Sequence, residues 1–162
     1  MKWLIKNFEA LIASMGFVLM LVSVTVNVFS RFFFSKSFSS SEELAFLGFT
    51  YCVFFGASML YRKNALIAID IIVDRLNVKA RQVIKILNFT ILTVVNIYLV
   101  YLSINLSVVA WVRPTAALRI PYTFIDVSAV VAFTLMTIYS IRFLIDAIKG
   151  KEEVEVALED RK

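Results

Sequence analysis

The sequence is short of the residues from which most catalytic and metal sites are built. Its 162 residues include no histidine, one cysteine, 4 glycines and 2 prolines, and only 18% are charged. Histidine is the commonest metal ligand and the commonest acid–base group, so its absence argues against both kinds of site. The single cysteine, Cys52, excludes an intrachain disulfide. We therefore expect neither an enzyme nor a protein that holds a cofactor or a metal ion.

Glycine and proline are also too scarce for a self-contained transport site. Transporters bind ions and substrates with broken helices, whose backbone is exposed by glycine and proline near the middle of the membrane. Both prolines, Pro114 and Pro121, lie close together near the ends of two apolar runs. The sequence also lacks a glycine-rich phosphate loop and a nucleophile with its base.

Apolar residues, in contrast, make up 60% of the chain, and the mean hydropathy is +0.84. These values exceed what the core of a soluble domain requires. Four apolar runs occupy about 10–30, 44–61, 86–112 and 120–141, and the only charged residue in them is Asp126 in the fourth. Each can form a membrane span, because about 20 apolar residues cross a bilayer core. We predict an all-α integral membrane protein with one domain of four transmembrane helices over 1–148 and a charged tail at 149–162.

Lysine and arginine are distributed unevenly between the segments that separate these runs. The two termini and the 62–85 segment carry 13 of the 17, whereas the 31–43 and 113–119 segments carry 4. The positive-inside rule therefore predicts that both termini and the 62–85 segment are cytoplasmic. The net charge of +5 reflects this topology and does not indicate a nucleic-acid partner.

The segment 64–81 has the pattern of an amphipathic helix. Its apolar residues recur at helical spacing opposite a narrow polar stripe, namely Leu66, Ile69, Val73 and Leu76 against Asp70, Asp74, Asn77 and Arg81. We expect this helix to lie in the membrane surface or against another membrane protein, with a polar face that simply meets water as the alternative. The first residues, with Trp3 beside two lysines, predict a second interfacial helix or a frayed terminus with an aromatic anchor.

Small and polar residues within the runs predict contacts between helices. Gly48, Cys52 and Gly56 are spaced by four and share one helix face, where a neighbouring helix can approach closely. Polar side chains within a span also form hydrogen bonds between helices. The residues expected to do so are Asn27, Asn96 and Asn105.

Two adjacent glutamates, Glu42 and Glu43, stand directly before the second run. Ser40 and Glu43 have the Ser-x-x-Glu spacing of a capping box, and a carboxylate at a helix N-terminus is favoured by the helix dipole. The capping box does not require Glu42. A contact of the pair with another protein is therefore an equally open hypothesis.

In their order along the chain, these features resemble the small membrane subunit, of the DctQ or SiaQ type, of tripartite ATP-independent periplasmic (TRAP) transporters. In that family an acidic pair opens the second span, a basic pair closes it, and an Ile-x-x-Asp-like segment and an Ile-Pro step follow. The matching positions here are, in chain order, Glu42 and Glu43, Gly56 within the second span, Arg62 and Lys63, Ile67 and Asp70, and Ile120 and Pro121. The likeness extends from Asn27 and Arg31 to about Arg142. The chain departs from the family at Ser40, near Leu66 and at Val130, where tryptophan, histidine and proline are common.

The resemblance implies a non-catalytic subunit of the bacterial inner membrane. Its partners would be membrane lipids, a large multi-span subunit that carries the sodium and substrate sites, and a periplasmic binding protein that delivers organic acids such as sialic acid or dicarboxylates. The small subunit would brace the scaffold of the large one, with sodium bound on the large partner. The positions expected at partner interfaces or in membrane positioning are Arg31, Glu42, Glu43, Gly48, Cys52, Gly56, Arg62, Lys63, Asp70 and Pro121.

Two other classes remain open. A small four-span transporter that acts as a homo-oligomer would need a carboxylate embedded in the membrane, and the 10–30 run has none. Asp126, the one charge inside a run, is interpreted as a helix-end carboxylate at the outer interface. An assembly or regulatory subunit of an unrelated channel or enzyme complex would have the same packing faces, and only the identity of its partner would distinguish it.

Overall fold

The computed structural model describes residues 7–34, 38–63 and 78–149. Within these ranges the chain forms four helices, α2 (Phe8–Phe34), α3 (Ser39–Arg62), α5 (Val78–Ala110) and α6 (Thr123–Ile148). Each is long and apolar enough to cross a membrane. The prediction of an all-α protein with four membrane spans is confirmed, whereas the side of the membrane that each end faces stays a prediction.

The helices extend beyond the apolar runs that predicted them. Helix α5 begins at Val78, so residues 78–81, assigned from the sequence to the interfacial helix at 64–81, belong to a long transmembrane helix instead. Helix α6 begins at Thr123 rather than at 120 and continues past Arg142 to Ile148. A charge ends an apolar run but not a helix, because a long basic side chain can carry its charge to the membrane surface. The rest of the 64–81 segment with Asp70, the first residues with Trp3 and the tail from 150 lie outside the described residues.

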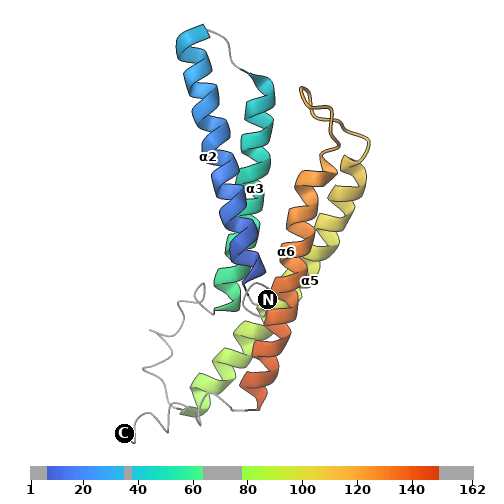
Figure 1. Cartoon of the computed structure of the whole chain (residues 1–162). Helices are drawn as coiled ribbons and strands as arrows, with labels where there is room; N and C mark the ends of the chain where they lie inside the picture. The colour runs from blue at the N-terminus through green and yellow to red at the C-terminus, as the bar shows by residue number, and fades with distance from the viewer. Residues whose placement is uncertain (1–6, 35–37, 64–77, 150–162) are drawn as a thin grey trace, which may run out of the picture.

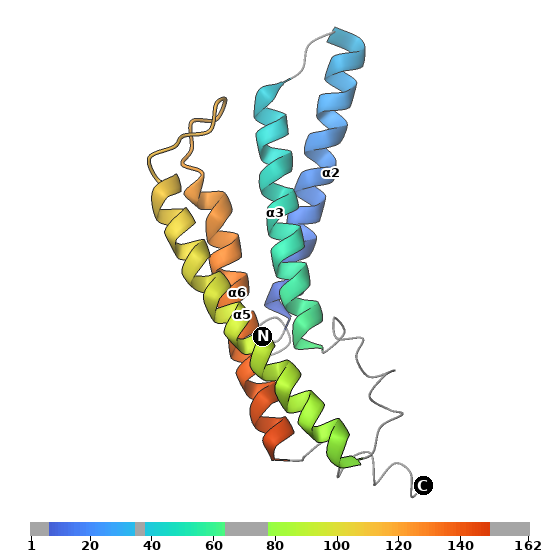
Figure 2. The same ribbon diagram turned by 180° about the vertical axis from the view of Figure 1, so that it is seen from behind.

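The helices form an open row in the order α2, α3, α6, α5. Extensive contacts join α2 to α3, α3 to α6 and α6 to α5, so α2 and α5 are the edges of the row. Figures 1 and 2 show the two pairs from opposite sides, with α3 next to α6. We call the end where residues 111–122 connect α5 to α6 the loop end, and the opposite end, where α2 begins and α3 finishes, the terminal end; α5 and α6 extend beyond it (Figure 1).

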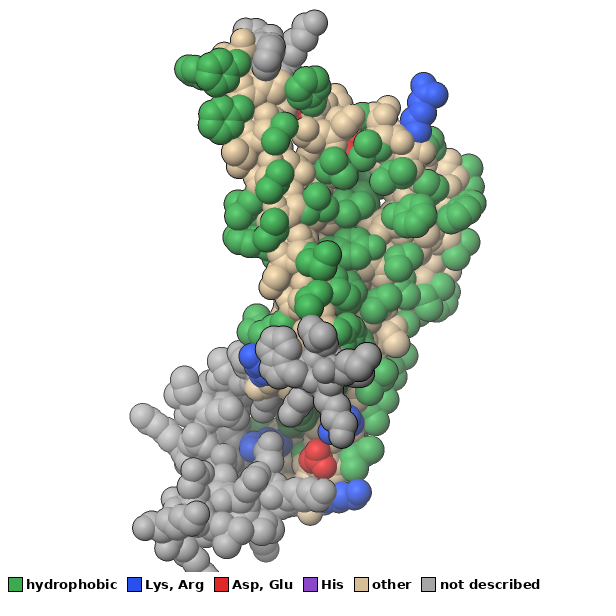
Figure 3. All heavy atoms as spheres, viewed as in Figure 1, with side chains coloured by type: hydrophobic (Ala, Val, Ile, Leu, Met, Phe, Trp, Pro, Cys, Tyr) green, Lys and Arg blue, Asp and Glu red, His purple; other side chains and the backbone are tan. Residues whose placement is uncertain are grey.

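An open row buries little of its own surface. In the most apolar window of each span, only 11% to 28% of the residues are buried. Figure 3 shows apolar side chains over most of the visible helix surface, with charged side chains near the two ends. Lipid or another membrane protein must therefore cover broad faces of every helix.

Helices α2 and α3 pack together through glycine. A Cβ on Gly16 would lie 2.7 Å from the carbonyl oxygen of Gly48, and a Cβ on Gly48 would lie 2.7 Å from the carbonyl oxygen of Gly16. The close approach expected at Gly48 is therefore present, and a Cβ on Gly16 would also lie 2.9 Å from the backbone N of Cys52. No described helix of this chain approaches Gly56, whose Cβ would meet nothing within 4 Å, so a close approach there by a partner helix stays a prediction. Two crossed helices diverge on either side of their contact point, and Gly56 lies beyond it.

The two pairs meet along a seam between α3 and α6. Near the loop end, the Tyr51 hydroxyl donates a hydrogen bond of 2.9 Å to the carbonyl oxygen of Phe124. Farther along, the rings of Phe54 and Phe133 meet edge to face with centroids 5.5 Å apart. The seam is aromatic in its middle, and polar clusters connect the helices at both ends.

Candidate functional site

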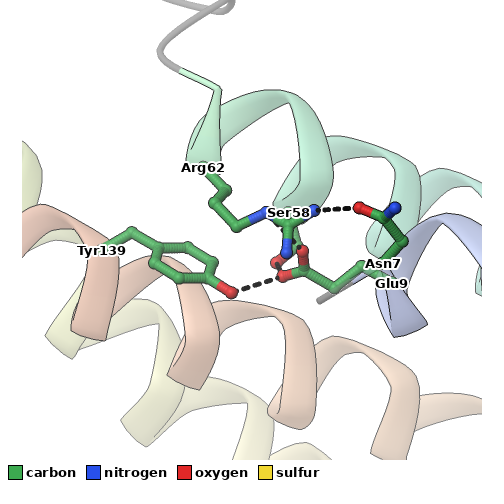
Figure 4. Close-up of polar contacts among 5 residues, drawn as sticks. All are labelled: Asn7, Glu9, Ser58, Arg62 and Tyr139. Atoms are coloured by element: carbon green, nitrogen blue, oxygen red, sulfur yellow. Dashed lines mark hydrogen bonds and ion pairs between the residues drawn. The ribbon is translucent and has the colours of Figure 1, made fainter. Parts of the chain in front are cut away.

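At the terminal end, Glu9 is the centre of five polar residues that we call the Glu9 cluster: Asn7, Glu9, Ser58, Arg62 and Tyr139 (Figure 4). Ser58 and Tyr139 donate hydrogen bonds of 2.8 and 2.9 Å to Oε1 of Glu9. The other oxygen, Oε2, takes no hydrogen bond from the described residues but lies 3.2 Å from Nε of Arg62 in an ion pair. Arg62 also donates a hydrogen bond of 3.4 Å to the side-chain oxygen of Asn7. The cluster therefore ties α2, α3 and α6 together.

The burial of Glu9 explains why it needs these partners. Its side chain is 0% exposed, whereas that of Arg62 is 22% exposed. A carboxylate with no partner would be very costly at this position, because neither lipid nor packed protein can solvate its charge. The guanidinium and the two hydroxyls replace water around Glu9, so the carboxylate acts as a tie between helices.

A second polar group adds α5 to this tie. The hydroxyls of Tyr61 and Ser140 share a hydrogen bond, and Asn96 donates from Nδ2 to the Ser140 hydroxyl (3.1 Å) and to the Tyr61 hydroxyl (3.4 Å). The hydrogen bond between helices that was predicted for Asn96 is confirmed. Because Tyr139 and Ser140 are neighbours on α6, one turn of that helix contacts both polar groups. All four described helices are thereby connected through these two neighbouring polar groups.

Sequence reasoning missed Glu9, because the residue lies directly before the first apolar run and looks like a flanking charge. Arg62 was expected to fix the depth of its span, and its pairing within the chain was not foreseen. One signal was available. Glu9 and Arg62 flank two successive spans on the same predicted side of the membrane, and a short connection makes such spans antiparallel neighbours.

At the loop end, Glu43 holds the connection between α5 and α6. Its carboxylate accepts hydrogen bonds from the backbone N–H groups of Ala117 (2.7 Å) and Leu118 (2.8 Å). Successive N–H groups that point at one anion form a concave anion site, and the charge strengthens each hydrogen bond. The predicted capping box of Ser40 and Glu43 is wrong, since α3 begins at Ser39 and no side chain caps it. The carboxylate binds a distant loop in preference to its own helix.

The loop that Glu43 holds is itself a small hairpin. Pro114 and Pro121 form an antiparallel bridge, and the Thr115 N–H donates a hydrogen bond of 2.8 Å to the carbonyl oxygen of Ile120. Arg119 has a left-handed backbone with φ of 56°, which turns the chain near the tip. Pro121 thus shapes the loop that places two N–H groups against α3.

Glu42 has a different partner. Asn27 donates a hydrogen bond of 3.1 Å from Nδ2 to Oε1 of Glu42, and its Oδ1 accepts one of 3.2 Å from the Phe38 N–H. The hydrogen bond between helices that was predicted for Asn27 is confirmed. Glu42 therefore joins the start of α3 to α2, whereas Glu43 joins it to the loop.

The remaining predicted positions lie apart from these clusters, and their contacts with a partner stay predictions. Arg31 is exposed in the last turn of α2, where the helix dipole favours a basic residue. Lys63 is exposed at the end of α3. Asp126 lies in the first turn of α6, as expected of a helix-end carboxylate. Asn105 donates a hydrogen bond of 3.0 Å to the carbonyl oxygen of Tyr101 in its own helix, so it joins no two helices within the described chain, and a bond to a partner helix stays a prediction.

The clusters have the chemistry of structural ties. Their carboxylates are matched by a guanidinium, by hydroxyls and by backbone N–H groups. Within the described part of the chain, no three acidic or cysteine side chains come together in a way that could hold a metal ion. What this arrangement can do is hold four helices and one loop at fixed positions.

Comparison with known proteins identifies the family. The model of the family described as "Tripartite ATP-independent periplasmic transporters, DctQ component" matches residues 20–150, a range that includes Glu42, Glu43 and Arg62 but begins after Glu9. A Haemophilus influenzae protein with the provisional name TRAP transporter small permease protein is 26% identical over 131 residues, which are 81% of this chain and 79% of that protein. The chain therefore belongs to the DctQ family, a component of tripartite ATP-independent periplasmic transporters.

Proposed function

We propose that this chain is the non-catalytic small membrane subunit of a sodium-driven TRAP transporter for organic acids, such as sialic acid or dicarboxylates. The observation that carries this proposal is the DctQ family match over residues 20–150. The subunit would lie in the bacterial inner membrane with both termini in the cytoplasm. The distribution of lysine and arginine between the segments supports that orientation.

The role that we assign to the chain is to brace the large subunit that carries the sodium and substrate sites. An open row suits this role, because its broad apolar faces are not closed on one another and remain available to a partner. A brace must also keep its shape under load. The Glu9 cluster ties the helices at the terminal end, and Glu43 ties α3 to the loop between α5 and α6 at the other.

A second part of the proposal concerns the periplasmic binding protein. The positive-inside rule places the loop end outside, on the side from which that protein would arrive. Exposed charges at this end are Arg31, Glu42, Arg113 and Arg119, and they are the side chains that we assign to its docking. Glu43 would act indirectly, by keeping the hairpin of residues 113–122 in place.

Affinity purification tests the central proposal. A tagged chain is extracted from its native membrane in a mild detergent, and the proteins that accompany it are identified by mass spectrometry. We expect one large multi-span membrane protein in equal amount. Recovery of this chain alone as a homo-oligomer would refute the proposal and favour a small self-contained transporter, and recovery of an unrelated channel subunit would refute it in favour of the third class.

Uptake measurements test the substrate and the driving ion. Cells that produce the complete transporter are given labelled sialic acid or a labelled dicarboxylate, with and without a sodium gradient. We expect uptake of at least one of these acids, and only with sodium. Equal uptake in the two conditions would contradict the sodium-driven part of the proposal, and uptake of neither acid would contradict the proposed substrate class.

A further inference from the structure

The edge helix α5 presents polar side chains to the outside of the row. Tyr98, Tyr101 and Asn105 recur at i, i+3 and i+7 and therefore share one face, which we call the α5 polar stripe. Tyr98 is 62% exposed, Tyr101 is 65% exposed, and Asn105 is exposed as well. Among the described residues, nothing forms a hydrogen bond with either tyrosine hydroxyl or with Oδ1 of Asn105. These polar atoms face outward at the membrane-facing surface of the chain.

The stripe lies too deep to be an aromatic belt at the membrane surface. Trp111, 63% exposed directly after the end of α5, occupies the position expected of such a belt residue. At a rise of about 1.5 Å per residue, Tyr98 lies about 18 Å and Tyr101 about 14 Å from Ala110 along the helix. Because a hydrocarbon core is about 30 Å thick, Tyr98 lies near the middle of the membrane.

Lipid is a poor neighbour for these groups, because hydrocarbon has no hydrogen-bonding atoms with which to satisfy a hydroxyl or an amide. The opposite edge of the row provides a direct comparison. On α2, Met15, Val18 and Val22 occupy the same i, i+3, i+7 positions with exposures of 65%, 58% and 56%, and all three are apolar. The α2 edge therefore suits lipid, whereas the α5 edge requires a neighbour with hydrogen-bonding groups.

We propose that the α5 polar stripe binds a transmembrane helix of the large subunit, so that the row meets its partner through the α5 edge and turns the α2 edge toward lipid. This inference rests on the proposed function, which supplies the membrane partner. The partner helix would present polar side chains, or carbonyl groups uncovered by small residues, to the two phenols and the amide of the stripe.

A second copy of this chain fits the stripe less well. Between 91 and 109 the exposed residues of α5 are all large, since Ser103 and Ser107 are buried in the described structure. Two such faces cannot approach closely, because close approach between membrane helices depends on small residues in the contact. The small residues must therefore come from a different helix.

Site-specific photocrosslinking tests the proposal in the complete transporter. p-Benzoylphenylalanine replaces Tyr98 or Asn105 in the stripe and, as a matched control, Val18 on α2. After irradiation of intact membranes, we expect a shifted band from both stripe positions that contains peptides of the large subunit, and no such band from Val18. A band with twice the mass of this chain, no shifted band from the stripe, or equal yield from Val18 would each overturn the inference.

An apolar variant of the stripe supplies a second measurement. The triple change Tyr98→Phe, Tyr101→Phe and Asn105→Leu keeps the shape of the face and removes its polar atoms. We expect association with the large subunit to weaken about twentyfold, since three hydrogen bonds between helices are lost, while the amount of chain in the membrane stays unchanged. Unchanged association would overturn the inference. If the unmodified chain purifies without any large subunit, the proposed function fails first, so the two failures are distinguishable.

Discussion

Replacement of Glu9 by alanine should destabilise the fold more than any other single change of a carboxylate in the described helices. Glu9 is fully buried, pairs with Arg62 and accepts hydrogen bonds from Ser58 and Tyr139. Glu9→Ala removes the ion pair and leaves both hydroxyls without this acceptor. It also opens a cavity and leaves the Arg62 guanidinium without its main counter-charge.

The magnitude follows from these contacts. Removal of one partner from a buried ion pair costs about 3–5 kcal/mol. The lower part of that range applies here, because Arg62 keeps 22% of its side chain exposed and water can reach part of its charge. The lost hydrogen bonds add about 0.6 kcal/mol each, the average measured between membrane helices. We expect Glu9→Ala to lower the free energy of unfolding by about 4 kcal/mol, and Glu9→Gln to cost about half of that, because glutamine keeps the acceptor oxygen and the volume but not the charge.

Reversible unfolding in mixed micelles measures this free energy, with helix content followed by circular dichroism. Asp146→Ala is the matched control, because Asp146 is a partly exposed carboxylate at the same end of the row, and its loss should change the free energy by less than about 0.5 kcal/mol. The pair of changes Glu9→Ala and Arg62→Ala forms a double-mutant cycle, from which we expect a coupling of about 2 kcal/mol. A loss below about 1 kcal/mol for Glu9→Ala, or a coupling near zero, would refute the view that the ion pair ties α2 to α3.

The other predictions concern the helix crossing, the loop and its turn. Gly48→Ala should lower the free energy of unfolding by about 1–3 kcal/mol in the same assay, because its Cβ would lie 2.7 Å from the backbone of α2. Gly56→Ala is the control and should not destabilise the chain, since its Cβ would meet nothing within 4 Å. A destabilised Gly56→Ala variant and an unaffected Gly48→Ala variant would contradict the crossing. Glu43→Ala should speed hydrogen exchange of the Ala117 and Leu118 amides by about tenfold or more, since each loses a hydrogen bond to a charged group, whereas Glu42→Ala should leave them slow. Equal exchange in the two variants would show that Glu43 does not hold the loop. Arg119→Val should cost about 1–2 kcal/mol because a β-branched residue resists the left-handed backbone at φ of 56°, while Arg119→Gly should be tolerated, and the opposite order would contradict this turn.

The number and positions of the spans were predictable from the apolar runs of the sequence alone. A run of about 20 apolar residues crosses a bilayer wherever its neighbours lie, so the signal is local and the four helices appear where the runs predict them. Helix ends were less predictable. Arg142 was placed just after the fourth run and residues 78–81 at the end of an interfacial helix, yet they lie within α6 and α5. Charged residues near a helix end do not interrupt its backbone hydrogen bonds.

The polar ties were partly visible in the sequence. Asn27 and Asn96 were identified from their places inside apolar runs, since an amide in a membrane needs a partner. Asn105 fits the same rule equally well, but it faces out of the row and bonds its own helix. Which way a residue faces depends on the rotation of its helix against a neighbour, and spacing within one run does not specify that rotation.

By itself, therefore, the sequence determined that this is a four-span membrane protein and which of its residues are polar enough to need partners. Only the tertiary structure decided the order of the row and the identity of those partners. Glu9 meets Tyr139 across 130 positions of chain, and Glu43 meets Leu118 across 75. Such pairs form because α3 packs against both α2 and α6 and so brings their residues close together. That order is set by close packing of whole helix faces, such as the Gly16 and Gly48 contact, rather than by any local pattern.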